Sequence, residues 1–235
     1  MPQLEGSPSP HRWNQIKRLE LRPLVQTLDQ YERAVLRGGV DALAYLRDID
    51  PLQQLRVADL RQVHHLMFTG AHPWAGNFRR PGELAIVSGY PAADAPRIGR
   101  ELELAIRQMQ EILEAAIEDQ NASGLVAALA FFHIRFERVH PFMDGNGRCG
   151  RLVLAVQFEK CFGRLPSVSN QEGYRRAIRD SGRRELATLI NYLGAAVDLP
   201  NVESWRSPFR LEPRFLESSV ATSMEEDLRW SRIEM

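Results

Sequence analysis

The chain has 235 residues, enough for one sizeable domain with extensions and a large buried core. Hydrophobic residues make up 44% and charged residues 26%, which excludes the composition of a disordered chain. Thirty basic residues balance thirty acidic ones, so no long-range field draws the whole molecule to nucleic acid or to an anionic membrane, and we expect neither partner.

The N-terminus has no apolar h-region, and no stretch approaches the roughly 20 apolar residues needed to span a bilayer. The two cysteines, Cys149 and Cys161, lack the spacing of a disulfide framework. We therefore expect a cytoplasmic protein. A specialised secretion route for an effector leaves no such mark, so delivery into another cell stays open.

The first fifty residues are predicted to form a disordered terminus followed by helices. Residues 1–11 are rich in Gly, Ser and Pro, so we expect them to be disordered. From Trp13 onward, apolar residues recur at helical spacing, with a break at Pro23. The Gly38-Gly39 pair is expected to end this run. Residues 12–49 are thus predicted to form a helical N-terminal extension.

The rest of the chain alternates helical patterns with one loop region. Residues 69–96 hold several glycines and prolines around one β-branched pair, Ile86-Val87, which predicts a loop with one hairpin near residues 82–90. Residues 125–136 are apolar nearly all round, which is typical of a helix at the centre of a domain. Helices are predicted over residues 40–48, 51–68, 97–118, 125–136, 152–162 and 172–197.

The stretch HPFMDGNGRCGR, residues 140–151, has the features of a phosphate site. Gly145 and Gly147 allow backbone conformations in which successive N–H groups form an anion-binding nest. The following helix adds unpaired N–H groups and the positive end of its dipole. Arg148 and Arg151 share a helix face at that end, where each cation is normally disfavoured by roughly 0.3–1 kcal/mol. We therefore expect an anion between them.

Two further side chains complete this pattern. Asp144 is an isolated carboxylate beside the positive cluster and is suited to hold Mg²⁺ that bridges phosphate oxygens. His140 can accept a proton near neutral pH. Each residue alone has a plainer interpretation as a packing histidine, a turn or a surface arginine. Their conjunction within twelve residues, between two apolar helices, favours a catalytic site.

This stretch resembles the signature of the Fic family: His-Pro-Phe, any residue, Asp or Glu, Gly-Asn-Gly-Arg, two of any residue, Arg. All nine specified positions match. The segment LMFTGAHPWAGNFRR, with Trp74, Gly76 and Phe78-Arg79, is similar to the family's segment before its flap hairpin. The resemblance implies a mostly α, Fic-type bundle of six to nine helices around a buried central helix, with one small β-hairpin flap. It implies a Fic domain over residues 50–196, followed by a partly helical tail over residues 197–235.

By this resemblance the protein is a protein adenylyltransferase that moves AMP from Mg·ATP to a Ser, Thr or Tyr hydroxyl of a target protein. His140 would be the general base, and Asp144 would hold Mg²⁺. Phe142 would be buried and fix the loop. The nucleotide-binding residues would be Gly145, Asn146, Gly147, Arg148 and Arg151, and the target-docking flap would consist of Leu84, Ala85, Ile86 and Val87.

Family members are often restrained by a glutamate, in a Ser/Thr-x-x-x-Glu-Gly/Asn helix, that pairs with the second motif arginine. That arginine would be Arg151. No segment of this chain matches the pattern in full, and Thr222-x-x-x-Glu226 is the preferred partial match. Glu226 is therefore a candidate inhibitory residue in cis. The alternatives are a solvated terminal helix with no inhibitory role and a separate, antitoxin-like inhibitor protein that supplies the glutamate in trans.

Other functions and sites stay open at this point. Related enzymes of this scaffold transfer UMP or other phosphate-containing groups or remove AMP, and a non-catalytic scaffold that only binds nucleotide is a further alternative. His64 and His65 are adjacent, so they cannot form the i, i+4 pair of a zinc protease, and we expect one buried and one exposed. We expect His133 to be a packing residue. Cys149 lacks an evident activating histidine, although a helix N-terminus lowers thiol pKa.

Overall fold

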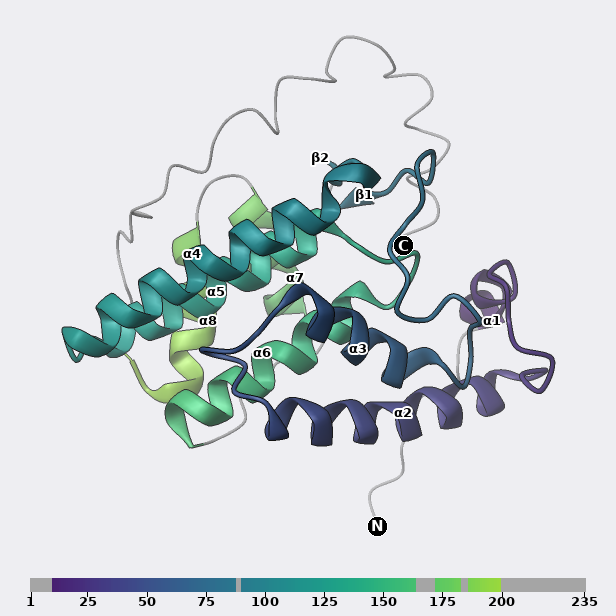
Figure 1. Cartoon of the computed structure of the whole chain (residues 1–235), viewed down its shortest axis with the longest axis horizontal. Helices are drawn as coiled ribbons and strands as arrows, with labels where there is room; N and C mark the ends of the chain where they lie inside the picture. Colours follow the sequence, from purple (N-terminus) through teal and green to yellow (C-terminus); the bar gives the residue numbers. More distant parts are fainter. Residues whose placement is uncertain (1–9, 88–89, 164–171, 183–185, 200–235) are drawn as a thin grey trace, which may run out of the picture.

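The computed structural model describes residues 10–87, 90–163, 172–182 and 186–199, and these residues form a mostly helical molecule with one pair of short strands (Figure 1). The mostly α prediction is confirmed. The strands pair antiparallel, with Ile86 opposite Pro91 and Val87 opposite Tyr90. The elements are α1 (Pro10–Ile16), α2 (Leu28–Asp48), α3 (Val57–Phe68), β1 (Ile86–Val87), β2 (Tyr90–Pro91), η1 (Ala95–Arg97), α4 (Ile98–Glu118), α5 (Ala122–Val139), α6 (Asn146–Phe162), α7 (Glu172–Gly182), α8 (Leu186–Gly194) and η2 (Ala195–Val197).

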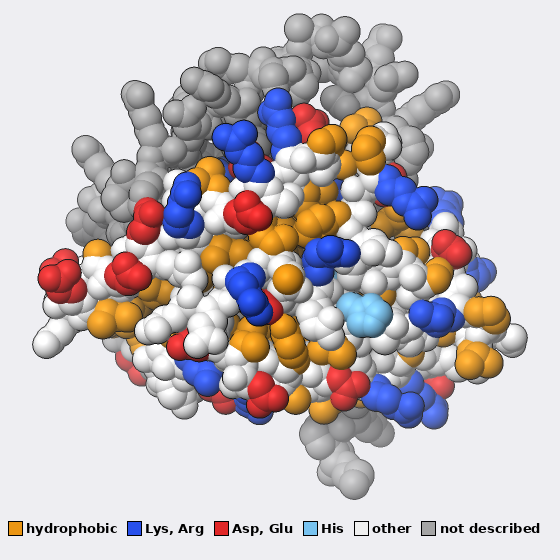
Figure 2. Space-filling model, in the orientation of Figure 1, with side chains coloured by type: hydrophobic (Ala, Val, Ile, Leu, Met, Phe, Trp, Pro, Cys, Tyr) orange, Lys and Arg blue, Asp and Glu red, His pale blue; other side chains and the backbone are white. Residues whose placement is uncertain are grey.

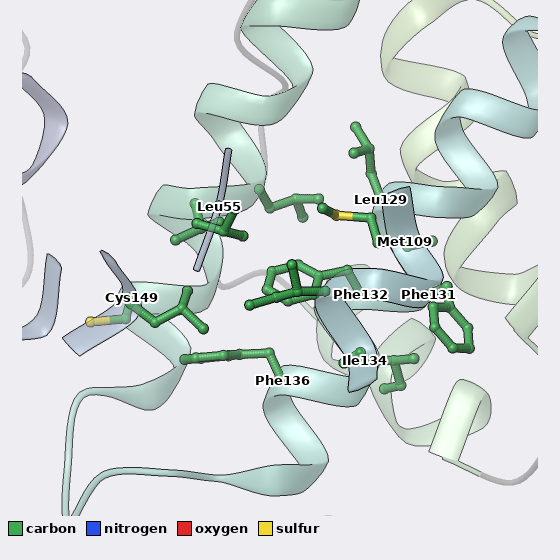
Figure 3. Packing of buried hydrophobic residues seen from close by; sticks show 14 of the residues in the cluster. Leu55, Met109, Leu129, Phe131, Phe132, Ile134, Phe136 and Cys149 are labelled. Atoms are coloured by element: carbon green, nitrogen blue, oxygen red, sulfur yellow. The ribbon is translucent and has the colours of Figure 1, made fainter. Parts of the chain in front are cut away.

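Helix α5 is the centre of the core, as its sequence predicted. It is buried on almost every side, with α4, α6 and α8 packed around it. Figure 1 shows α2 and α4 along opposite edges of the molecule, with α5 and α6 between them. Phe131 and Phe132 leave α5 in different directions, and Phe136 follows one turn later (Figure 3). The C-terminal end of α5 at Val139 is buried in the core as well.

Helix α2 passes through Gly38-Gly39 without a break, so the predicted helix end there is wrong. A Cβ at Gly38 would collide with the carbonyl oxygens of Leu66 and Met67 on α3. The glycine therefore permits a close approach of the two helices. Packing along this contact outweighs the roughly 1 kcal/mol by which glycine disfavours a helix.

Three other predicted boundaries change. Helix α3 begins at Val57 rather than at residue 51, because the Asp59 carboxylate accepts the Arg56 backbone N–H (2.8 Å) and caps the helix there. Helix α6 begins at Asn146 rather than at residue 152, so half of the motif is helical. The single helix predicted over residues 172–197 is described as α7 and α8, and residues 183–185 between them lie outside the described part.

The N-terminal segment packs onto the domain through a small second cluster that joins α1 to α2. Its buried members are Ile16, Val25, Tyr31 and Ala71. Helix α1 starts at Pro10, so it includes two of the residues expected to be disordered. The remaining nine residues of that segment lie outside the described part, as do the tail from residue 200 onward and Glu226 within it.

The described surface carries both signs of charge. Lys and Arg side chains alternate with Asp and Glu side chains across the face in Figure 2, as expected for a chain of zero net charge. Among the described helices, none is both long enough and apolar enough to cross a bilayer.

Candidate active site

His140 terminates α5 in a left-handed backbone conformation, with φ 46° and ψ 61°. This conformation turns the chain sharply and places the imidazole at the end of the buried helix. Its Nδ1–H donates to the Glu137 carbonyl at 3.4 Å, which leaves the Nε2 lone pair to accept a proton. Burial lowers the pKa of His140 to about 4. The imidazole is therefore neutral near pH 7, as a general base must be.

The turn after His140 is closed by Asn146. The Phe142 backbone N–H donates to Asn146 Oδ1 (2.9 Å), and Asn146 Nδ2 donates to the Phe142 carbonyl (2.8 Å). The Asn146 side chain is thus used inside the turn, and only its backbone N–H is available to a ligand. Phe142 is completely buried, as predicted, and anchors the turn to the core.

His64 of α3 supports the same turn from the other side. The Gly76 N–H donates to its Nδ1 (2.8 Å), so the proton resides on Nε2, which donates to the Asp144 carbonyl (3.0 Å). The ring stacks on Phe142 with centroids 3.8 Å apart. Burial lowers the pKa of His64 to about 4, which fits this neutral form. His64 is buried and His65 exposed, as predicted, but the support of the turn was not foreseen.

The predicted phosphate-binding groups lie at the N-terminus of α6. Gly145 has φ 82°, and a Cβ there would collide with the Phe68 ring, so this position requires glycine for two reasons. The Cys149 N–H bonds the Gly145 carbonyl (2.9 Å), so the amides of residues 146–148 precede the first intrahelical bond. Gly147 is helical and has no positive φ, so the predicted nest is wrong at that position. The amides of residues 146–148 instead lie in the first turn of a helix, an arrangement that favours anions.

Arg148 and Asp144 form an ion pair within the motif. Arg148 NH2 donates to Asp144 Oδ2 (2.7 Å), and Arg148 NH1 donates to the Tyr31 hydroxyl (3.1 Å). The guanidinium also lies over Phe68, with Cζ 4.5 Å from the ring centroid. Burial favours protonated Asp144, but Arg148 and the Gly145 amide outweigh it and lower the pKa of the carboxyl.

Tyr31 is a residue that sequence reasoning missed. It lies in α2, is fully buried and is separated by 113 residues from Asp144, whose Oδ2 accepts from its hydroxyl at 3.4 Å. Its only sequence signal was membership of an apolar helical stripe. That stripe indicates burial but does not distinguish a core tyrosine from one that reaches a site.

Arg151 contacts a different element from Arg148, with its Cζ 5.8 Å from the Tyr174 ring centroid in α7. The two motif arginines therefore have different neighbours, although both belong to the first two turns. His133 is buried and its Nε2 is 2.5 Å from the Tyr174 hydroxyl, in line with a packing histidine. Burial raises the pKa of the Cys149 thiol far above its usual range, which argues against a thiolate nucleophile.

Residues 54–158 match the Fic/DOC family model. A Drosophila grimshawi protein described as protein adenylyltransferase Fic is 24% identical over 200 residues, which cover 77% of this chain and 39% of that relative. The matched segment identifies a Fic domain in this chain. The family match runs from the end of the turn before α3 into α6, so Tyr31 and Tyr174 approach the site from outside the matched segment.

Solved Fic structures share this fold at low identity. The N-terminal Fic domain of a putative cell filamentation protein from Bartonella quintana, solved with bound ADP, aligns with a TM-score of 0.59 at 20% identity, covering 76% of this chain and 89% of that one. BepC from Bartonella tribocorum, solved with bound AMPPNP, aligns with a TM-score of 0.53 at 20% identity and covers 74% and 91%. The chain therefore has a Fic-type fold, as predicted.

The Fic flap is the short hairpin of β1 and β2. The Ala92 N–H donates to the Ala85 carbonyl (2.8 Å), so Ala85 faces β2. Alternate residues of an antiparallel strand face opposite edges, so the Ile86 N–H points away from β2. Leu84 is 91% exposed, and Ile86 and Val87 are partly exposed. The predicted flap residues thus include both residues of β1, whose other edge pairs with no strand within the described residues.

The donor set of this Fic domain fits Mg²⁺ only as a partner of nucleotide phosphates. Within the described residues there is no group of three or more His, Cys, Asp or Glu placed to hold a metal ion. Asp144 is a single carboxylate, one of whose oxygens is already paired with Arg148. Mg²⁺ is commonly held by one or two carboxylates together with phosphate oxygens and water. The site therefore fits a metal that arrives with its nucleotide.

Proposed function

We propose that this Fic domain transfers AMP from ATP to a Ser, Thr or Tyr hydroxyl of a target protein, with His140 as the general base. One observation carries the proposal: a neutral imidazole, fixed by a left-handed turn, lies just before the N-terminus of a helix with unpaired amides. A base and an anion site thus come together on two rigid helices. This combination suits nucleotidyl transfer, where positioning and charge stabilisation dominate.

In the proposed reaction, the target hydroxyl oxygen attacks the α-phosphorus of ATP. A new oxygen–phosphorus bond forms, the bond to the bridging oxygen of pyrophosphate breaks, and the hydroxyl proton passes to His140 Nε2. The amides of residues 146–148 bind phosphate oxygens, and Arg148 and Arg151 offset the negative charge on the leaving pyrophosphate. Mg²⁺, held by Asp144 and by phosphate, would neutralise charge on the triphosphate.

The relatives support the nucleotide and the type of reaction. The Drosophila relative is described as a protein adenylyltransferase, and the two Bartonella structures hold AMPPNP and ADP. This chain spans 39% of the length of that curated relative, so the target protein, and any inhibitor protein, have to be found by experiment.

Labelled ATP tests the proposal directly. The purified protein is incubated with MgCl₂ and ATP labelled at the α- or the γ-phosphate, alone and with a cell lysate, and protein-bound label is measured. We expect label from α-ATP and none from γ-ATP. Label from γ-ATP would indicate kinase chemistry, and preserved ATP binding without any label would favour a scaffold. Competition by unlabelled UTP would show a different nucleotide preference.

A further inference from the structure

Arg79 connects the flap to the turn that carries His140. Its side chain is only 7% exposed, and its guanidinium donates to four backbone carbonyls. Two belong to the end of α5, those of His140 (2.6 Å) and Val139 (3.2 Å). The other two lie on either side of the hairpin, those of Glu83 (2.5 Å) and Ala93 (2.8 Å). One side chain thus holds both arms of the flap and the base-bearing turn.

The backbone of Arg79 adds a fifth contact, because its N–H donates to the Pro141 carbonyl (2.8 Å). A left-handed residue at a helix end leaves the last carbonyls without helical partners. Arg79 supplies donors to two of those carbonyls. Its positive charge also lies at the negative end of the α5 dipole, where a cation is favoured.

A buried arginine is nevertheless an unfavourable way to satisfy carbonyls at a helix end. Among the described residues, no carboxylate lies within ion-pair distance of its guanidinium, although Glu83 and Asp94 are near enough to interact with its charge. Burial lowers the pKa of this guanidinium, and the charges of Glu83 and Asp94 offset that effect only in part. Burying a charge without an opposite charge in contact is unfavourable, whereas carbonyls at a helix end can be satisfied by neutral donors. Capping alone therefore does not explain the cation.

We propose that Arg79 is a positioning residue that fixes the flap and the His140 turn relative to each other and holds the imidazole ready to accept the target's proton. This inference rests on the proposed function, since a target segment would dock on the flap. A target backbone aligned along β1 would then be held by the same side chain that fixes His140. Sequence reasoning included Arg79 only within the segment before the flap and gave it no role.

The charge of Arg79 has a second effect on His140. Three groups around the imidazole influence its ionisation besides burial: the Glu137 carbonyl and the Asp144 carboxylate favour the charged form, and Arg79 disfavours it. Removing this cation should therefore raise the pKa of His140 toward its ordinary value. A residue that merely filled space would not have this effect.

The test uses Arg79→Gln, which removes the charge, and Arg79→Lys, which keeps it but cannot reach all four carbonyls. Arg80→Gln is the matched control, since Arg80 is adjacent and exposed. The pKa of His140 is measured by NMR titration of its Cε1–H, assigned with His140→Ala. Self-labelling from α-labelled ATP gives kcat and the KM for ATP. Thermal unfolding shows that each variant is folded.

We expect Arg79→Gln to raise the pKa of His140 and Arg79→Lys to leave it near the wild-type value. Both should lower kcat about tenfold or more while the KM for ATP stays within about twofold, and Arg80→Gln should match wild type. An unchanged pKa of His140 in folded Arg79→Gln would overturn the proposal, as would wild-type kcat in Arg79→Lys. If Arg79→Gln does not fold, the Arg79→Lys result alone decides.

The NMR titration needs no substrate, so the two proposals fail separately. If wild-type protein transfers no label but Arg79→Gln still raises the pKa of His140, the function is wrong and the coupling of Arg79 to His140 stands. If transfer occurs and the pKa and kcat do not respond to Arg79, the function stands and the positioning inference is wrong.

Discussion

The turn that carries His140 and the flap that faces it are built in opposite ways. Residues 140–146 are held by Asn146 from within, by His64 from α3 and by the burial of Phe142. The flap has two short strands and exposes Leu84 almost fully. Both belong to the same proposed reaction, yet one is rigid and the other has few contacts.

This difference matches the two proposed tasks, catalysis by the turn and target binding by the flap. A base and phosphate donors must be in place before the transition state, so rigidity there lowers the barrier. A flap that binds targets through its backbone edge gains from few side-chain constraints, because main-chain hydrogen bonds suit many sequences. Changes in the turn should therefore affect catalysis strongly, and changes in the flap should affect target transfer moderately.

The largest effect is expected for His140→Ala. Loss of the base should lower the rate of AMP transfer about a hundredfold to ten-thousandfold while ATP affinity stays within a few-fold. Rates come from labelling with α-labelled ATP and affinities from calorimetry. His65→Ala, which removes an exposed histidine on α3, is the control and should behave as wild type. Transfer at the wild-type rate by His140→Ala would exclude the proposed base.

Arg148→Ala and Arg151→Ala should each weaken both ATP binding and turnover, by about tenfold to a hundredfold. Each arginine would make charge-assisted hydrogen bonds to phosphate in the ground state and in the transition state. Arg107→Ala, on the exposed side of α4, is the matched control. If neither motif variant weakens ATP binding in a calorimetric titration, the triphosphate does not lie at the N-terminus of α6.

The support of the turn by neutral His64 predicts a pH dependence of stability. The unfolded histidine has a pKa near 6.5 and the folded one about 4, so between these values the unfolded chain binds more protons. The free energy of unfolding should therefore fall as pH decreases through this window, with His64 contributing about 2 kcal/mol between pH 7 and pH 5.

Adjacent histidines provide a matched test. His64→Asn should be less stable than wild type at pH 7 but should lose less stability on acidification to pH 5. His65→Asn makes the same substitution at the adjacent, exposed side chain and is the matched control. Urea unfolding at several pH values measures both. Equal slopes in His64→Asn and wild type would show that His64 does not titrate in this window.

The smallest effect is expected in the flap. Ile86→Pro removes an N–H that faces the free edge of β1 and leaves the bond between Ala92 and Ala85 in place. Label transfer to target proteins in a lysate should fall several-fold, with ATP affinity unchanged. Ile86→Ala keeps the N–H and serves as the control. Parallel loss of ATP affinity would show that the hairpin supports the nucleotide site.

Much of the site was readable because its residues are neighbours in sequence. The motif residues His140, Asp144, Gly145, Arg148 and Arg151 lie within twelve positions. The apolar stretch before them, which forms α5, indicates a buried helix that supports the motif. Local spacing determines which groups share a turn or a helix face. The family, the mostly α fold and the candidate residues follow from that information.

Only the tertiary structure decided which distant residues support this motif and where the helices begin and end. Tyr31, His64 and Arg79 reach the motif across 61 to 117 residues, and no local pattern distinguishes them from ordinary core or surface residues. Gly38 remains inside α2 because the close packing of α3 against it outweighs the poor helix propensity of glycine. These contacts and helix boundaries depend on packing between elements that are far apart in the sequence. The motif could be recognised from the sequence because its residues are neighbours along one stretch of backbone.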